Sequence, residues 1–215
     1  MRLVAIALTA ITAMAAAATI AFAPGASALP HRSAGPGLGL SKEAPEGPVF
    51  SLPPGLELQN PILAHSPENP VDCDNKYPED GFGNGDAVTL CLIFRNTTNR
   101  SITLTLPPGL LVVAHSDKVQ GGFLVQRTVI EVPAGERYFA PLFLHCANED
   151  RDTSTPGDEY ALGPVISYPQ FEEFYRLLEG TEISRQETAY VQFVIIRLTQ
   201  GERLTQEDRA TLAAM

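Results

Sequence analysis

The sequence has no tryptophan, only three cysteines and few basic residues, and it lacks the short motifs that organise common catalytic sites. There is no H-E-x-x-H pair to hold a catalytic zinc, no C-x-x-C redox dithiol and no G-x-S-x-G nucleophile turn. His65, His115 and His145 are separated along the chain, so each is expected to be a structural or an exposed histidine. The sequence therefore nominates no catalytic residue, and we expect a protein that is not an enzyme.

Basic side chains are outnumbered, because 15 Lys and Arg stand against 25 Asp and Glu, giving a formal net charge of -10. A surface of this sign repels phosphate backbones, so nucleic acid is not an expected partner. Divalent cations and basic partners are compatible with the charge. A solvated acidic surface without any dedicated ligand is the commoner explanation of such a charge.

The N-terminus has the pattern of a bacterial export signal. Arg2 supplies the positive charge, an almost unbroken apolar run covers residues 3–23, and residues 26–28 form a small-residue cleavage site. We expect residues 1–28 to be a signal peptide cleaved after Ala28, which places the protein in the periplasm or outside the cell. A retained anchor is the alternative, because the apolar run is long enough to span a bilayer. No membrane span is expected in the mature chain.

Three regions follow the signal. Residues 29–54 are rich in proline and glycine without a hydrophobic period, which predicts a flexible leader. The alternative for this segment is a strap that packs on the domain through Leu38, Leu40, Val49 and Phe50. Residues 55–167 are expected to form a β-domain, and residues 168–215 a helical annex.

Alternating apolar residues predict strands over most of the β-domain. The candidate strands are 56–64, 87–95, 102–106, 110–115, 123–132 and 136–146. In the second of these, the even-numbered residues from 88 to 94 share one face, and we expect a hairpin with the third through a turn at 96–101. The segment PAGE, 133–136, predicts a tight turn. Six or seven strands at this spacing predict a mainly β fold, an antiparallel immunoglobulin-like β-sandwich.

The hydrophobic period changes to three and four residues from position 169, which predicts an amphipathic helix. Ser184 with Glu187, and Thr205 with Asp208, have the spacing of a capping box, so two further helices are predicted to begin at these positions.

The composition of the middle helix is also compatible with a strand. Residues 188–199 include several β-branched side chains, so a central strand is the alternative. As a helix the segment is apolar nearly all round, which predicts burial, with Gln192 as its conspicuous polar member.

Residues 72–86, DCDNKYPEDGFGNGD, concentrate acidic, amide and glycine residues. Calcium prefers hard oxygen ligands on a glycine-bearing loop. The candidate calcium ligands are Asp72, Asp74, Asp80, Asn84 and Asp86. An EF-hand loop opening at Asp72 or at Asp80 does not fit the pattern, so such a site would be irregular. The alternative is a solvated turn whose glycines, Gly81, Gly83 and Gly85, adopt positive φ.

Three cysteines in an exported chain predict one disulfide and one remaining thiol. Cys91 and Cys146 both lie in predicted strands, and we favour a bridge between them that would resemble the inter-sheet bridge of immunoglobulin-like domains, with Cys73 as the spare. The alternatives pair Cys73 with Cys91 or with Cys146, which would tie the acidic loop to the sheet.

Two segments resemble the thioester domains of bacterial surface adhesins. They are LFLHCAN, 142–148, and AYVQFVIIRLTQGE, 189–202. In that family a strand cysteine and a helix glutamine condense into an internal thioester that traps nucleophiles on host surfaces. By position the resemblance makes Cys146 the thiol and Gln192 the acyl donor. The sequence departs from the family pattern at other positions, including His145, Val191 and Val194.

These features together predict an exported, non-enzymatic cell-envelope or extracellular protein. We expect it to have a binding or structural role and to meet a protein or glycan partner through loops at one end of the β-domain. Calcium is a candidate stabiliser of residues 72–86. The alternative function is a covalent surface adhesin that uses Cys146 and Gln192.

Overall fold

The computed structural model describes residues 33–135 and 137–215, so the expected signal peptide, 1–28, lies outside the described residues. The described elements belong to one unit, His31–Met215. The strands are β1 (Leu56–Leu58), β2 (Ile62–Ala64), β3 (Phe82–Gly83), β4 (Val88–Asn96), β5 (Ile102–Leu106), β6 (Leu110–Ala114), β7 (Gly122–Phe123), β8 (Thr128–Val132), β9 (Arg137–Cys146) and β10 (Glu159–Val165). The helices are α1 (Pro169–Leu178), α2 (Arg185–Thr199) and α3 (Gln206–Leu212), with short 3-10 turns η1 (Pro70–Cys73) and η2 (Pro78–Asp80).

Six antiparallel strands close into a barrel, in the order β4, β2, β10, β6, β7, β9 and back to β4. The closing pair, β4 with β9, runs in continuous register from Val88 opposite Leu144 to Arg95 opposite Arg137. Two further pairings extend this sheet: β1 pairs with the end of β4, and β3 pairs in parallel with β9. β5 pairs with β8 in a separate two-stranded sheet.

The predicted immunoglobulin-like sandwich is therefore wrong, because the main sheet closes on itself through β4 and β9. The predicted hairpin is wrong as well, since β4 pairs with β9 while β5 pairs with β8. The alternation of apolar residues identifies which side chains face inward, but it says nothing about which strand is the neighbour.

Asn96 ends β4 and stabilises the connection to β5, a strand with which β4 does not pair. Its side chain is buried, and its Nδ2 donates to the main-chain oxygens of Arg100 at 2.8 Å and of Val132 at 3.0 Å. Its Oδ1 accepts from the N–H and the hydroxyl of Thr98. One amide thus ties the end of β4 to the end of β8, which holds the two sheets together at this corner.

The inward face that the sequence predicts for β4 is confirmed. Val88, Leu90, Leu92 and Phe94 are each at most 1% exposed and belong to the cluster that fills the barrel. The β5–β8 sheet adds its buried residues to this cluster: Leu104, Leu106, Ile130 and Val132.

Two predicted strands are interrupted, and two strands of the structure, β3 and β10, were not predicted. The segment 56–64 is divided into β1 and β2, and the segment 123–132 is divided between β7 and β8. β10 lies between β2 and β6 in the ring, although the sequence pattern does not predict a strand over these residues. It contains Gly163 and Pro164, residue types that are depleted in strands and that hide its pattern.

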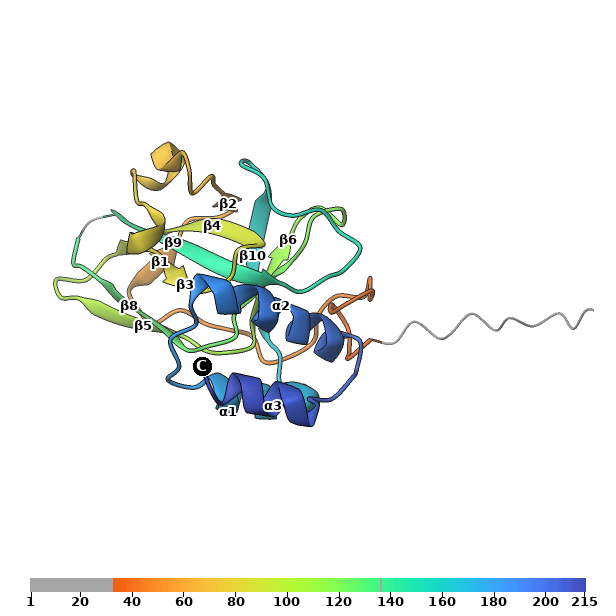
Figure 1. Ribbon diagram of the computed structural model, residues 1–215. Coiled ribbons are helices and arrows are strands. Elements are labelled where there is room, and N and C mark those ends of the chain that lie inside the picture. The colour runs from red at the N-terminus through yellow and green to blue at the C-terminus, as the bar shows by residue number, and fades with distance from the viewer. Residues whose placement is uncertain (1–32, 136) are drawn as a thin grey trace, which may run out of the picture. The chain divides into compact units, whose positions relative to one another are not determined.

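The three C-terminal helices agree with the sequence expectation, and they gather on one side of the barrel (Figure 1). Both predicted capping boxes are present, at Ser184 with Glu187 and at Thr205 with Asp208. Residues 188–199 lie in a helix and not in a strand. A second apolar cluster joins the helices to the outside of the barrel; it includes Phe123, Phe171, Phe174, Val191, Val194 and Ile195.

Residues 33–52 of the segment expected as a flexible leader lie against the domain, as in the strap alternative, although the side chain of Val49 is exposed. Leu38 is fully buried in the second apolar cluster. The N–H of Gly39 donates to the main-chain oxygen of Ala147 at 2.9 Å, and Val49 forms an antiparallel bridge with Pro164. Burial of Leu38 and these main-chain hydrogen bonds offset the entropy that ordering a proline-rich segment costs.

Candidate ligand-binding groove

The second half of the acidic loop, residues 72–86, packs directly against β9 because three alternate residues there are glycines. A Cβ on Gly81 would lie 2.2 Å from the ring of Phe143, one on Gly83 2.3 Å from Phe143 O, and one on Gly85 2.0 Å from the carbonyl carbon of Leu144. Of these glycines only Gly83 has a positive φ, 80°. The glycines therefore serve close backbone approach more than the turn conformations that the sequence suggested.

Asn84, between these glycines, connects three parts of the molecule. Its Nδ2 donates to Oε1 of Gln126 at 2.6 Å, and its Oδ1 lies 3.2 Å from Nε2 of His145. Gln126 in turn donates from Nε2 to the main-chain oxygens of Leu178 and Thr181. Because the NH2 group of Gln126 has to face these carbonyls, its side-chain oxygen faces Asn84 and accepts from the Asn84 NH2 group. The side-chain oxygen of Asn84 therefore faces His145 and acts as an acceptor there.

His145 is buried on β9, and burial lowers its pKa to about 4. The imidazole is therefore neutral at physiological pH and donates from Nε2 to Asn84. This is the structural role that the sequence predicts for it.

The first turn of α2 is fastened to the same loop. Ser184 caps the helix by accepting from the N–H of Glu187, and the Glu187 carboxylate accepts from the N–H of Ser184 at 2.7 Å. One turn later, the hydroxyl of Thr188 donates to the main-chain oxygen of Asn84 at 3.0 Å. The helix and the glycine loop thus keep a fixed separation.

A groove of about 400 Å³ lies between the glycine loop and the start of α2. Its size falls within the range of small-molecule sites, roughly 300–1,000 Å³. Phe143 of β9 contributes an aromatic ring, and prolines and Ile183 contribute further apolar surface. The residues that line it are Pro67, Pro78, Gly83, Asn84, Gly85, Asp86, Thr89, Phe143, Ile183, Arg185 and Thr188.

Two exposed side chains of opposite charge, Asp86 and Arg185, line the groove. Within the described residues neither side chain has a hydrogen-bond or ion-pair partner, and the same holds for the hydroxyl of Thr89. An acceptor, a donor and a hydroxyl are therefore available to a molecule that enters.

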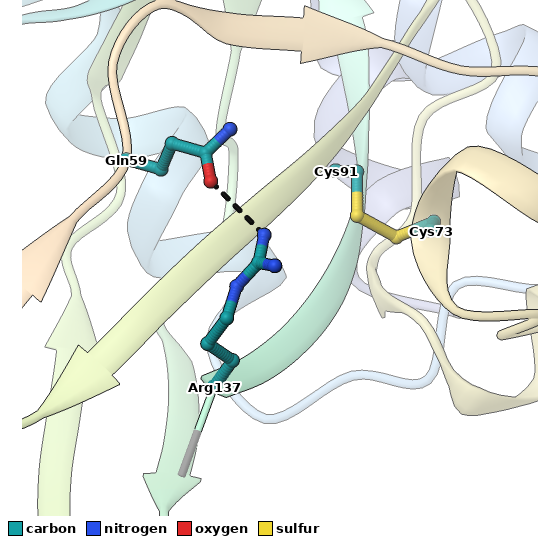
Figure 2. The surroundings of a disulfide bond; sticks show 4 residues. All are labelled: Gln59, Cys73, Cys91 and Arg137. Carbon is teal, nitrogen blue, oxygen red and sulfur yellow. Dashed lines mark hydrogen bonds between the residues drawn. A yellow bond between two sulfur atoms is a disulfide. The ribbon is translucent and has the colours of Figure 1, made fainter.

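A disulfide between Cys73 and Cys91 joins the first half of the acidic loop to β4. The favoured pairing of Cys91 with Cys146 is wrong, and one of the two alternatives, which ties the loop to the sheet, is the one present. Figure 2 shows the bridge beside the hydrogen bond from Arg137 to Gln59, 3.1 Å long. The bridge anchors the chain between Pro67 and Pro78, which both line the groove.

Cys146 remains a free, buried thiol. Its sulfur donates to the main-chain oxygen of Asn148 at 2.6 Å, and burial raises its pKa to about 11. Gln192 of α2 lies on the main chain of Cys146: Oε1 accepts from the Cys146 N–H at 2.8 Å, and Nε2 donates to its oxygen at 3.2 Å. The structure therefore brings together the two residues that the thioester resemblance singles out.

The structure describes the side chains of four of the five candidate calcium ligands. Asp72 and Asp74 are exposed on the disulfide-linked turn, and the side chain of Asp80 lies outside the described part of the molecule. Asn84 uses its oxygen on His145, and Asp86 lines the groove. In the described ranges, no group of three His, Cys, Asp or Glu side chains is placed to hold a metal ion.

Several groove residues could not be recognised from the sequence. Phe143 has the appearance of an ordinary strand residue, and Arg185 that of a first-turn helix residue. The one signal that pointed to this place is the glycine-rich half of the acidic loop, because alternate glycines permit close packing on another strand.

No protein-family model, curated protein or solved structure matches the chain. Over the described residues, none of the helices has the length and apolar character needed to cross a bilayer.

Proposed function

We propose that this chain is exported and acts as a non-enzymatic binding protein of the cell envelope or the extracellular space, with its partner held in the groove between the glycine loop and α2. The observation that carries the proposal is the pair of unpartnered charges, Asp86 and Arg185, at a groove of ligand size. The groups available there are a carboxylate, a guanidinium, a hydroxyl and an aromatic ring, which recognise a ligand through hydrogen bonds and contact.

The rigidity of the groove supports the same function. The Cys73–Cys91 bridge, the Asn84 hydrogen bonds and the bond from Thr188 fix its walls before any partner arrives. A site that is already ordered loses less entropy on binding. Export accords with the disulfide, since such bridges persist in oxidising compartments.

Export is tested by sequencing the N-terminus of the protein recovered from its producing cells. We expect the mature chain to start at Leu29. Recovery of a chain that retains residues 1–28 from a membrane fraction would show that this segment is an anchor and not a cleaved signal peptide.

Binding is tested by sedimenting the purified protein with washed envelopes of the producing bacterium. We expect the wild type to co-sediment, and the double variant Asp86→Ala/Arg185→Ala to bind at least tenfold more weakly. Arg100→Ala/Asp117→Ala is the matched control, because both residues are exposed and line none of the grooves described. Equal binding by the two double variants would reject the groove as the site.

A second candidate function is covalent attachment through an internal thioester, and it is favoured by the contact between Gln192 and Cys146. In this reaction the Cys146 sulfur bonds to Cδ of Gln192, and the thiol proton leaves with the amide nitrogen as ammonia. The thioester would then acylate an amine on another surface.

Intact mass decides between a thiol and a thioester. A thioester lowers the mass by one ammonia, and methylamine adds to the protein at Gln192. A mass that equals that of the chain with one disulfide, unchanged by methylamine, would eliminate the covalent candidate.

A further inference from the structure

We propose that the ligand of the groove is a neutral carbohydrate, with one or two sugar rings held against Phe143 between Asp86 and Arg185. This inference rests on the proposed function and specifies its ligand class. Three properties of the groove lead to it: its charge pattern, its aromatic surface and its size.

The charge pattern favours a neutral ligand that both donates and accepts hydrogen bonds. A carboxylate only accepts hydrogen bonds, and a guanidinium only donates them. Sugar hydroxyls do both, so the hydroxyls of a ligand of one or two rings can donate to Asp86 and accept from Arg185. A phosphate or carboxylate ligand would meet repulsion from Asp86, and an ammonium ligand would meet repulsion from Arg185.

The aromatic surface suits the apolar face of a sugar ring. Phe143 is partly exposed and lines the groove, while the ring of His65 lies 6.5 Å away, measured between centroids, at an angle of 57°. Gly81 lies so close to Phe143 that any side chain there would collide with the ring. These neighbours fix the orientation of the aromatic face, which lowers the entropy lost when a flat ligand packs on it.

The size of the groove favours a small ligand over a folded protein. A stable protein interface needs about 800 Å² on each partner, which is far more than the lining of one depression offers. A volume of about 400 Å³ suits one or two sugar rings. Pro67 and Pro78 border it with rigid rings, so the opening keeps its width without the support of a partner.

The test uses a panel of neutral oligosaccharides of two to four sugar units, titrated into the purified protein and followed by calorimetry and by competition against envelope binding. We expect at least one sugar to bind and to displace the protein from envelopes. Phe143→Leu, which keeps apolar bulk but removes the aromatic face, should weaken that binding at least tenfold. Arg185→Ala should do the same, while Arg100→Ala should have no effect.

The charge argument has its own test. An acidic derivative of the bound sugar should bind the wild type more weakly than the neutral sugar, and Asp86→Asn should remove that difference. Asp86 and Arg185 are exposed, so these variants retain the fold even if a change at Phe143 disturbs it.

Two results would overturn the assignment while leaving the proposed function intact. One is envelope binding that needs Asp86 and Arg185, is abolished when the envelopes are treated with protease, and is unaffected by every sugar. The other is a preference for acidic over neutral sugars. Failure of the wild type to bind envelopes at all would instead remove the proposed function.

Discussion

The hydroxyl of Thr188 donates to the main-chain oxygen of Asn84, and this single bond couples the first turn of α2 to the glycine loop. Asn84 also holds His145 of β9 and Gln126 through its side chain. The wall of the groove is thus assembled from segments that are far apart in the sequence.

Replacing Asn84 with alanine should destabilise the protein by about 2–4 kcal/mol, because the buried imidazole of His145 and the partly buried amide of Gln126 would each lose a partner. Urea unfolding measures this change. Asn69→Ala is the matched control: Asn69 is exposed, and its side chain has no hydrogen bond within the described residues. A loss for Asn84→Ala no larger than that of the control would show that the network carries no stability.

The Cys146 thiol should resist alkylation in the folded protein. Burial raises its pKa to about 11 from 9.0, so the reactive thiolate is scarce at pH 8 and the sulfur is shielded. Stability should fall as the pH rises from about 9 towards 11, since the unfolded thiol loses its proton before the folded one does. Labelling with iodoacetamide in water and in urea, and pH-dependent unfolding of Cys146→Ala, check both points. Fast labelling of the native protein would contradict this account.

Asp208 should anchor α3, and Asp208→Asn should cost about 2–3 kcal/mol. Burial by itself would raise the pKa of this carboxyl, but hydrogen bonds from Thr205 and Tyr190 and the charge of Arg197 lower it overall. Its contribution is present above the unfolded pKa, near 3.8, and is lost as the pH falls through the lower folded value. Acid unfolding of the wild type and of Asp208→Asn, with Glu207→Gln as the exposed control, measures this difference.

Calcium should leave the melting temperature unchanged. The oxygen of Asn84 is engaged by His145, and the described residues contain no three-ligand cluster. A cation bound only by the folded state would have to raise the melting temperature by linkage. Thermal unfolding with millimolar calcium and with a chelator tests this expectation. An increase that Asp72→Asn and Asp74→Asn abolish would restore the calcium site.

The helices and the inward faces of strands were predictable because their signals are local. The capping boxes at Ser184 and Thr205 and the buried face of β4 depend on residues only a few positions apart. Strand pairing was not predictable in this way, since β4 finds its partner in β9, far along the chain. Asn96 is an example: it begins the segment that the sequence predicts to be a hairpin turn. In the structure its buried side-chain amide instead connects the two sheets.

The candidate site was predictable only in part. The acidic and glycine-rich character of residues 72–86 singled out the loop that borders the groove, and its glycines permit its close approach to β9. The rest of the groove comes from Phe143 and Arg185, whose proximity depends on the barrel and on the position of α2. The contact between Gln192 and Cys146 was suggested by a resemblance and not by any local pattern.

The long pairing of β4 with β9 also bears on how quickly the chain can fold. The opposed residues are 42 positions apart at Arg95 and Arg137, and 56 apart at Val88 and Leu144. Such contacts form only after a large loop has closed, so chain entropy is lost before the hydrogen bonds between the strands stabilise the pair. The resulting high contact order predicts slow folding. The nascent barrel would therefore spend a prolonged interval with unpaired strand edges, during which aggregation competes with closure of the ring.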